Sequence, residues 1–178
     1  MKSDRGQAIA GDEGGLEAAL EGPQVPHLAF DGRNYQGYRV SVKLIREPYR
    51  GRRPIDIMNA DDAYHFLKPL EEQDRESFWR LDLNCRNQLI GCEEVSKGHM
   101  SGSLVHPREV YKGAILSSAA AIIIAHNHPS GDPEPSEEDE SVTDRLIEAG
   151  QLLGIPLLDH IIVGSGSYWS MAAGKCRE

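Results

Sequence analysis

The sequence lacks a hydrophobic run long enough to cross a membrane. No apolar stretch among its 178 residues reaches the roughly 18 residues that a membrane-spanning helix needs. Its first residues, 1–24, also lack the apolar centre of a signal peptide. Both absences argue against contact with a membrane, and we expect a cytoplasmic protein.

Cysteine is scarce and shows no paired spacing. Cys85, Cys92 and Cys176 form no CxxC pair, and an odd number of cysteines argues against a disulfide scaffold. A thiolate nucleophile would need a neighbouring base, and the local sequence supplies none. We therefore interpret the three residues as reduced thiols without a catalytic role.

Acidic residues outnumber basic ones, but the excess is uneven. The net charge is −9. Residues 33–53 nevertheless carry seven basic side chains against Glu47 alone; these are Arg33, Arg39, Lys43, Arg46, Arg50, Arg52 and Arg53. Such a stretch can bind nucleic acid, or it can be a solvated strand whose charge balances an acidic body. Both interpretations remain open.

Two regions are predicted: an N-terminal extension over 1–53, partly flexible and with a basic strand at 35–47, and one domain over 54–178. The order of patterns from residue 78 onward, β, β, α, β, α, β, predicts an α/β domain with helices packed on a mixed sheet. Three helices are expected: one over 61–72 capped by Asn59 or Asp61, one from Pro107, and one from Ser136 to about Leu153. The expected strands are two within 77–96 around a turn at Arg86 and Asn87, a buried strand over 119–128, and a strand and hairpin over 156–170. The predicted core-facing residues are Ala63, Phe66, Leu67 and Leu70 in the first helix, Val110, Ala114 and Ile115 in the second, and Val142, Leu146, Ala149 and Leu153 in the third.

The segment HNHPSGDPEPSEED, residues 126–139, carries the densest chemistry. Alternation along a strand places His126 and His128 on one side of the predicted sheet, at the strand's end. Neutral imidazole is a common zinc ligand, so this spacing favours a metal site over two structural histidines. The zinc site of a nucleoside deaminase would need HxE and PCxxC, and neither occurs here.

The helix start that follows allows two interpretations. Ser136 and Asp139 have the spacing of a capping box, in which each side chain bonds the other's backbone. Asp139 could also be a third ligand beside the histidines, which would leave a fourth tetrahedral position for water. The two roles are compatible.

Zinc-dependent hydrolysis also needs a proton acceptor, for which a carboxylate near the site would serve. The candidates are Glu76, Glu93, Glu94 and Glu109. Glu76 stands directly before the apolar strand SFWRLDL, so it could reach the edge of the sheet. Position alone does not decide among the four.

The same segment resembles a known signature. It fits the JAMM pattern of H-x-H, seven residues, S, two residues, D, and residues 105–164 are densely similar to the RadC family, whose domain is of the JAB/MPN type. The similarity covers roughly residues 54–170. It implies a three-layer α/β/α sandwich with a mixed sheet, the cytidine-deaminase-like fold of MPN domains.

The resemblance also implies site residues and an activity. Zn²⁺ would bind His126, His128 and Asp139, with Glu76 as general base and Ser136 positioning water or stabilising a developing oxyanion. JAMM enzymes are typically metallopeptidases or isopeptidases, so a peptide or protein substrate is expected. The alternative is a DNA-associated protein of repair or recombination whose metal site does not cleave peptides, with Arg33–Arg53 contacting nucleic acid. Residues 1–53 do not resemble the helix-hairpin-helix region usual in RadC proteins, which weakens this alternative.

Four further polar residues have expected contacts. His160 is interpreted as a core histidine bonded to Asp159 or backbone, with a supporting role beside the metal as the alternative. Arg108 is expected to pair with Glu109 or with solvent, with binding of a substrate carboxylate as the alternative. Asn127 and Ser130 are expected to line the site.

Overall fold

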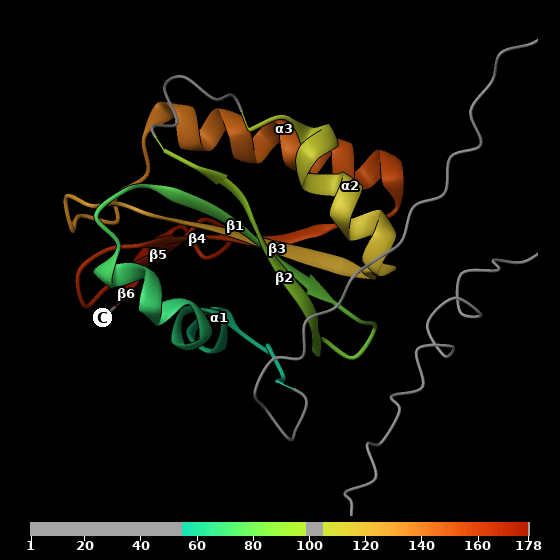
Figure 1. Ribbon diagram of the computed structural model, residues 1–178, viewed down its shortest axis with the longest axis horizontal. Helices are drawn as coiled ribbons and strands as arrows, with labels where there is room; N and C mark the ends of the chain where they lie inside the picture. The colour runs from blue at the N-terminus through green and yellow to red at the C-terminus, as the bar shows by residue number, and fades with distance from the viewer. Residues whose placement is uncertain (1–54, 99–104, 178) are drawn as a thin grey trace, which may run out of the picture. The chain divides into compact units, whose positions relative to one another are not determined.

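The computed structural model describes residues 55–98 and 105–177, which form one mixed sheet covered by helices on both faces (Figure 1). Its six strands lie in the order β2-β1-β3-β4-β5-β6. Their bounds are β1 Ser77–Leu83, β2 Leu89–Lys97, β3 Ala121–Asn127, β4 Leu157–Val163, β5 Tyr168–Ser170 and β6 Lys175–Arg177. Strands β3 and β4 run parallel, and the other neighbours run antiparallel. The predicted three-layer α/β architecture with a mixed sheet is confirmed, and β6 is an additional strand that the sequence patterns did not indicate.

Helices α2 (Pro107–Ser117) and α3 (Glu137–Leu153) cover one face of the sheet, and α1 (Ala60–Leu67) covers the other (Figure 1). The predicted helix over 61–72 continues past Leu67 only as a 3₁₀ turn, η3 (Lys68–Glu72). Pro69 explains the change, because proline has no N–H to continue the α-helical ladder. Asn59 caps α1 by accepting from the backbone N–H of Asp62.

The pleat of the strands separates two apolar cores. Leu81, Ile123 and Ile161 belong to the core beneath α1. Ile122 and Ile124 belong to the core beneath α2 and α3. Because neighbours such as Ile122 and Ile123 enter different cores, β3 is buried along its whole length. The predicted buried central strand is therefore confirmed.

The predicted core faces of α2 and α3 are correct only in part. Val110, Ala114, Val142 and Leu146 are buried, but Ile115 is 53% exposed and Leu153 is 45% exposed. The reason is the close contact of the two helices, where Tyr111 donates to the carbonyl oxygen of Leu146. A Cβ at Gly150 would clash with the Tyr111 hydroxyl oxygen and would lie 2.6 Å from the carbonyl oxygen of Ile155. The buried stripes thus pass through Tyr111 and Gly150 instead of Ile115 and Leu153.

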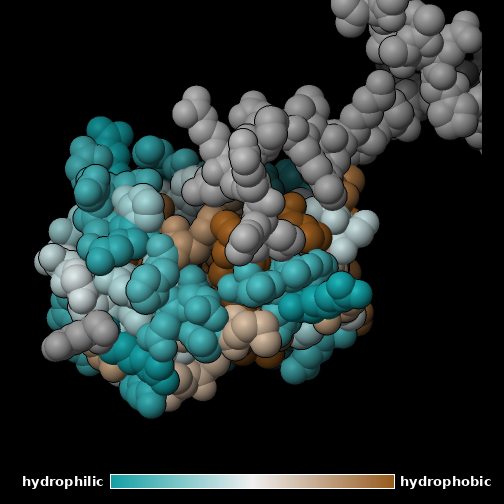
Figure 2. All heavy atoms as spheres, turned by 90° about the horizontal axis from the view of Figure 1, so that it is seen from below, coloured by the Kyte–Doolittle hydropathy of each residue, from teal (hydrophilic) through white to brown (hydrophobic). Residues whose placement is uncertain are grey.

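Hydrophilic side chains dominate the face seen from below, and hydrophobic ones show only in patches between them (Figure 2). Among the described residues, no helix is long and apolar enough to cross a membrane. The predicted strand at 35–47, the basic stretch Arg33–Arg53 and the boundary after residue 53 lie outside the described residues, so they stay predictions.

A buried ion pair fastens α2 to the sheet. Arg80 of β1 is 2% exposed and donates from Nε to Asp82 at 2.6 Å. Its two other nitrogens donate to Glu93 at 2.7 Å and to the carbonyl of Val110 at 2.8 Å. Ser117, at the end of α2, donates to Asp82 at 2.9 Å. Arg80 therefore holds the first turn of α2 through Val110, and Asp82 holds its last residue, Ser117.

We expect Asp82→Asn to lower the free energy of unfolding by about 3 kcal/mol, because it leaves the Arg80 charge buried without its buried partner. The matched control is Glu93→Gln, whose side chain is 49% exposed, and which should cost at most about 1 kcal/mol. Urea unfolding of both variants measures the difference. Equal small losses would show that Asp82 contributes no more than a surface ion pair.

Candidate metal centre

Two histidines reach the same point from the end of β3. His126 is the second-last residue of the strand and His128 follows its last residue, so both side chains lie on the α2/α3 side of the sheet. The backbone N–H of His128 still donates to Val163 of β4 at 2.9 Å. Parallel pairing thus holds the histidines beside the end of β4, at the edge where loops of α/β sheets usually form sites.

The loop after His128 turns sharply and returns to the sheet. Gly131 has a φ of +85°, which favours glycine, and its carbonyl accepts from Ser165 in the turn after β4 at 2.9 Å. His128 Nδ1 lies 2.7 Å from the carbonyl oxygen of Asp132 in the same loop. The loop therefore orients the His128 ring with its Nε2 toward His126.

The predicted capping box begins α3 and positions the carboxylate. Ser136 accepts from the N–H of Asp139 through Oγ at 3.2 Å. In return, its own N–H and hydroxyl donate to Asp139 Oδ2 at 2.8 and 2.6 Å. These bonds fix the Asp139 carboxylate at the N-terminus of the helix, which also favours negative charge.

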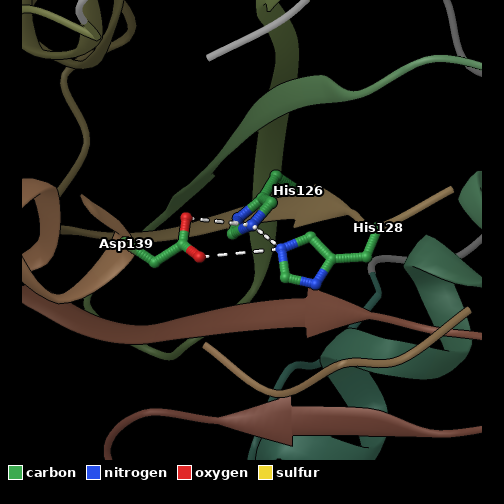
Figure 3. Close-up of side chains that lie close together, drawn as sticks. All are labelled: His126, His128 and Asp139. Atoms are coloured by element: carbon green, nitrogen blue, oxygen red, sulfur yellow. Dashed lines mark hydrogen bonds and ion pairs between the residues drawn. The ribbon is translucent and has the colours of Figure 1, made fainter. Parts of the chain in front are cut away.

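Figure 3 shows the carboxylate of Asp139 facing the imidazoles of His126 and His128. The Nε2 atoms of the histidines are 2.9 Å apart. Asp139 Oδ1 lies 3.2 Å from Nε2 of His126, and Oδ2 lies 3.6 Å from Nε2 of His128. Each residue offers a ligand atom, and these atoms lie within 4.8 Å of one another. The structure therefore brings together the three residues whose spacing indicated a metal site.

The site is largely buried, and burial disfavours the negative charge of a carboxylate. Asp139 is 2% exposed and His126 is fully buried, whereas the His128 side chain is 16% exposed. Burial raises the pKa of Asp139, but its contacts with His126, His128 and Ser136 favour the charged form and hold the pKa far below its usual range. The carboxylate thus stays ionised. A donor set of two imidazoles and one carboxylate fits Zn²⁺, and His128 forms the side that opens to solvent.

His160 of β4 differs from the main expectation. Its ring does not bond the Asp159 carboxylate, which instead accepts from the backbone N–H of His160 at 2.8 Å. The ring nitrogens lie 2.8 Å from Nδ1 of His126 and 2.7 Å from Oγ1 of Thr143. Burial lowers the pKa of His160 well below its ordinary value, so the ring is neutral. The alternative expectation, a supporting role behind a metal ligand, describes its contacts.

The four candidate bases have different surroundings. Glu93 pairs with Arg80, Glu109 with Lys112 and, more loosely, with Arg108, and Glu94 lies 3.9 Å from Lys97. The expected pairing of Arg108 with Glu109 is thereby confirmed. Glu76 stands directly before β1. The bond to Asp139 raises the pKa of His128, and the charge of Glu76 raises it further, so Glu76 lies near enough to His128 to favour its charged form.

Asn127, between the two histidines, points to the opposite side of the strand and does not line the site. It is 1% exposed, and its Oδ1 accepts from the N–H and the hydroxyl of Ser77 at 2.9 and 3.0 Å. Its Nδ2 donates to the carbonyl of Arg75 at 3.0 Å. Asn127 thus holds the backbone on both sides of Glu76, a role that the expectation of a site-lining residue missed.

Sequence comparison gives a consistent result. Residues 57–176 match the RadC-like JAB domain family. A UPF0758 protein of Moorella thermoacetica is 47% identical over 140 residues, which cover 79% of this chain and 56% of the relative. A UPF0758 protein of Methanosarcina acetivorans is 48% identical over 129 residues, covering 72% and 54%. The chain thus spans about half the length of the curated relatives it matches, and their names state no activity.

A mixed sheet between helices, with two histidines and a carboxylate gathered at a strand's end, defines an α/β domain that could hold a metal ion. With the match over 57–176, the chain belongs to the RadC family through its RadC-like JAB domain. The resemblance of residues 105–164 to that family is confirmed.

The His128–Asp139 contact predicts a pH dependence of stability in chelator-treated protein. Bonding to Asp139 raises the pKa of His128 above 6.5, so this stabilisation is full below 6.5 and is lost as pH rises through the raised pKa. Asp139 has a depressed pKa, so its contribution is present above 3.8 and fades in stronger acid. The stability difference between wild type and Asp139→Asn, measured by urea unfolding, should therefore shrink between about pH 5 and about pH 8. A constant difference would contradict this coupling.

Proposed function

We propose that the protein is a zinc-dependent hydrolase that cleaves a peptide or isopeptide bond. The observation that carries the proposal is the meeting of His126, His128 and Asp139, with His128 at the solvent side. Three protein ligands with a fourth position open to solvent are typical of catalytic zinc, whereas structural zinc is usually enclosed by four protein ligands.

The residues divide the chemistry between them. A zinc ion held by His126, His128 and Asp139 would supply a Lewis acid that lowers the pKa of a water molecule toward neutrality. Glu76 would serve as the general base that takes up a proton from the attacking water and returns it to the leaving nitrogen. Asn127 keeps the backbone around Glu76 in place through its bonds to Arg75 and Ser77.

In this scheme Ser136 holds the carboxylate of Asp139. Its hydroxyl donates to Asp139 Oδ2, which leaves Oδ1 directed at Nε2 of His126. Stabilising a developing oxyanion, the role that the family resemblance implies, would require the hydroxyl to turn away from Asp139. We propose holding the ligand as the main role of Ser136.

The alternative of a DNA-associated protein depends on the stretch Arg33–Arg53, which lies outside the described residues. No contact in the described ranges 55–98 and 105–177 favours it over hydrolysis. A peptide or protein therefore remains the proposed substrate.

The metal ligands can be tested by metal analysis of purified protein. Wild type should carry about one zinc per chain, and His128→Ala and Asp139→Ala should lose most of it, because two remaining ligands bind weakly. The matched control is His65→Ala, which removes an exposed histidine of α1 whose Nδ1 lies 2.7 Å from the carbonyl oxygen of Asp61 in the same helix. Wild-type zinc content in both ligand variants would refute the site.

Glu76→Gln tests the general base, because it keeps the shape of the side chain and removes its basicity. We expect normal zinc content and a loss of cleavage by about 10²- to 10⁴-fold. The probe is a pool of proteome-derived peptides mixed with peptides joined through lysine side-chain amides, and mass spectrometry counts the new termini. Glu94→Gln, which changes an exposed glutamate of β2, is the control. No cleavage by zinc-loaded wild type would contradict the proposed activity.

A further inference from the structure

The side chains behind His126 form a connected series of hydrogen bonds that leads back to Asp139. It runs from His126 Nδ1 to His160 Nε2 at 2.8 Å, and from His160 Nδ1 to Thr143 Oγ1 at 2.7 Å. Thr143 Oγ1 lies 2.6 Å from the backbone carbonyl oxygen of Asp139. The series therefore begins at one proposed ligand and ends at another.

The direction of the series is set at its helical end. The carbonyl of Asp139 can only accept, so the single hydroxyl hydrogen of Thr143 is donated to it. If that hydrogen instead pointed to His160, two oxygens without a hydrogen between them would face each other at 2.6 Å. Oγ1 of Thr143 is therefore an acceptor toward His160, and Nδ1 of His160 carries the hydrogen.

The hydrogen on Nδ1 of His160 determines which nitrogen of each imidazole donates and which accepts. A neutral histidine has one N–H, so Nε2 of His160 is an acceptor. Nδ1 of His126, 2.8 Å away, must then be the donor. The remaining nitrogen of His126, Nε2, lies 3.2 Å from Asp139 Oδ1 and 2.9 Å from Nε2 of His128. In a neutral His126 this nitrogen holds the lone pair that could bind a cation.

The surroundings leave these groups no alternative partner from solvent. His126 and His160 are fully buried and Thr143 is 6% exposed. The Phe78 ring stacks on His126 with 6.2 Å between ring centroids and meets the edge of His160 at 5.8 Å. These groups are shielded from water, where an unpaired polar atom lowers the stability of the fold. Each hydrogen bond therefore strongly favours one direction.

We propose that Thr143 and His160 are positioning residues that fix the tautomer of His126, with the hydrogen on Nδ1 and the lone pair of Nε2 directed at the metal. The inference rests on the proposed metal site and deepens it. Asp139 contributes two groups: its carboxylate is a proposed metal ligand, and its backbone carbonyl accepts the last hydrogen bond of the series. Partners behind a ligating histidine commonly change metal affinity about 10- to 100-fold.

The first test compares Thr143→Val with Thr143→Ser. Valine keeps the shape of threonine but removes the acceptor for His160, whereas serine keeps the hydroxyl. Zinc titration against a competing chelator should show about 10- to 100-fold weaker binding for Thr143→Val and near wild-type binding for Thr143→Ser. Unchanged affinity in Thr143→Val, with the fold confirmed by circular dichroism, would overturn the proposal.

The second test reads the tautomer directly and does not depend on zinc or on any variant. Two-bond proton–nitrogen spectra of chelator-treated wild type, with labelled histidine, distinguish protonated from bare ring nitrogens. At alkaline pH, His126 should carry its hydrogen on Nδ1 and His160 on Nδ1. A hydrogen on Nε2 of His126 would refute the series.

The two tests separate this inference from the proposed function. Wild type that binds no zinc would defeat the metal site, while the spectra would still decide the direction of the hydrogen bonds. A purely structural Thr143 would change stability but leave the tautomer of His126 as it is in wild type. A mixed tautomer in Thr143→Val and a wild-type tautomer in Thr143→Ser would support the proposal.

Discussion

The buried carboxylate of Asp139 is the constraint on which the rest of the site depends. A negative charge that is 2% exposed can persist only if its surroundings supply hydrogen-bond donors and positive charge. The helix start supplies donors through Ser136, and two imidazoles face the carboxylate from β3. Capping, strand pairing and the turn at Gly131 all serve to bring these groups to one place.

The protein contains a second buried charge, and the comparison is informative. Arg80 finds its counter-charges and acceptors inside the fold, from Asp82, Glu93 and Val110. Asp139 meets two imidazoles and the hydroxyl of Ser136 instead of a permanent positive charge. The charge of Arg80 is fully compensated by groups of the protein, and this arrangement fastens α2 to the sheet. The second arrangement has room in its charge balance for a cation, as the proposed metal site requires.

Much of the site could be predicted because it is local in sequence. Strand alternation placed His126 and His128 together, and the capping spacing placed Asp139 at a helix start. Thr143 was not predicted, since nothing in the sequence of α3 indicates that its hydroxyl meets a histidine of β4. That contact depends on how the helix lies across the sheet.

The same limit explains the other differences. Helical spacing favoured Ile115 and Leu153 as core residues, but the contact of Tyr111 with Leu146 and Gly150 turns other positions inward. Asn127 was expected beside the histidines, although the pleat sends its side chain to the other face. Periodicity within one element predicts a face, whereas the packing of two elements decides which residues on it are covered.

The antiparallel pairing of β1 with β3 sets Phe78 opposite His126, and Asn127 secures the residues just before that pair. Residues 126–128, at the end of β3 and just beyond it, thereby serve two purposes: the histidines face Asp139, and Asn127 fastens the segment that carries Glu76. A slip of one residue between these strands would exchange the faces of the β1 side chains, so that Leu81 and Phe78 would leave their present cores. It would also shift Glu76 by roughly 3.3 Å along the strand, the rise of one residue. The register that fills the two cores is therefore the same register that aligns Glu76 with the two histidines, so the stability of the fold protects the geometry of the candidate site.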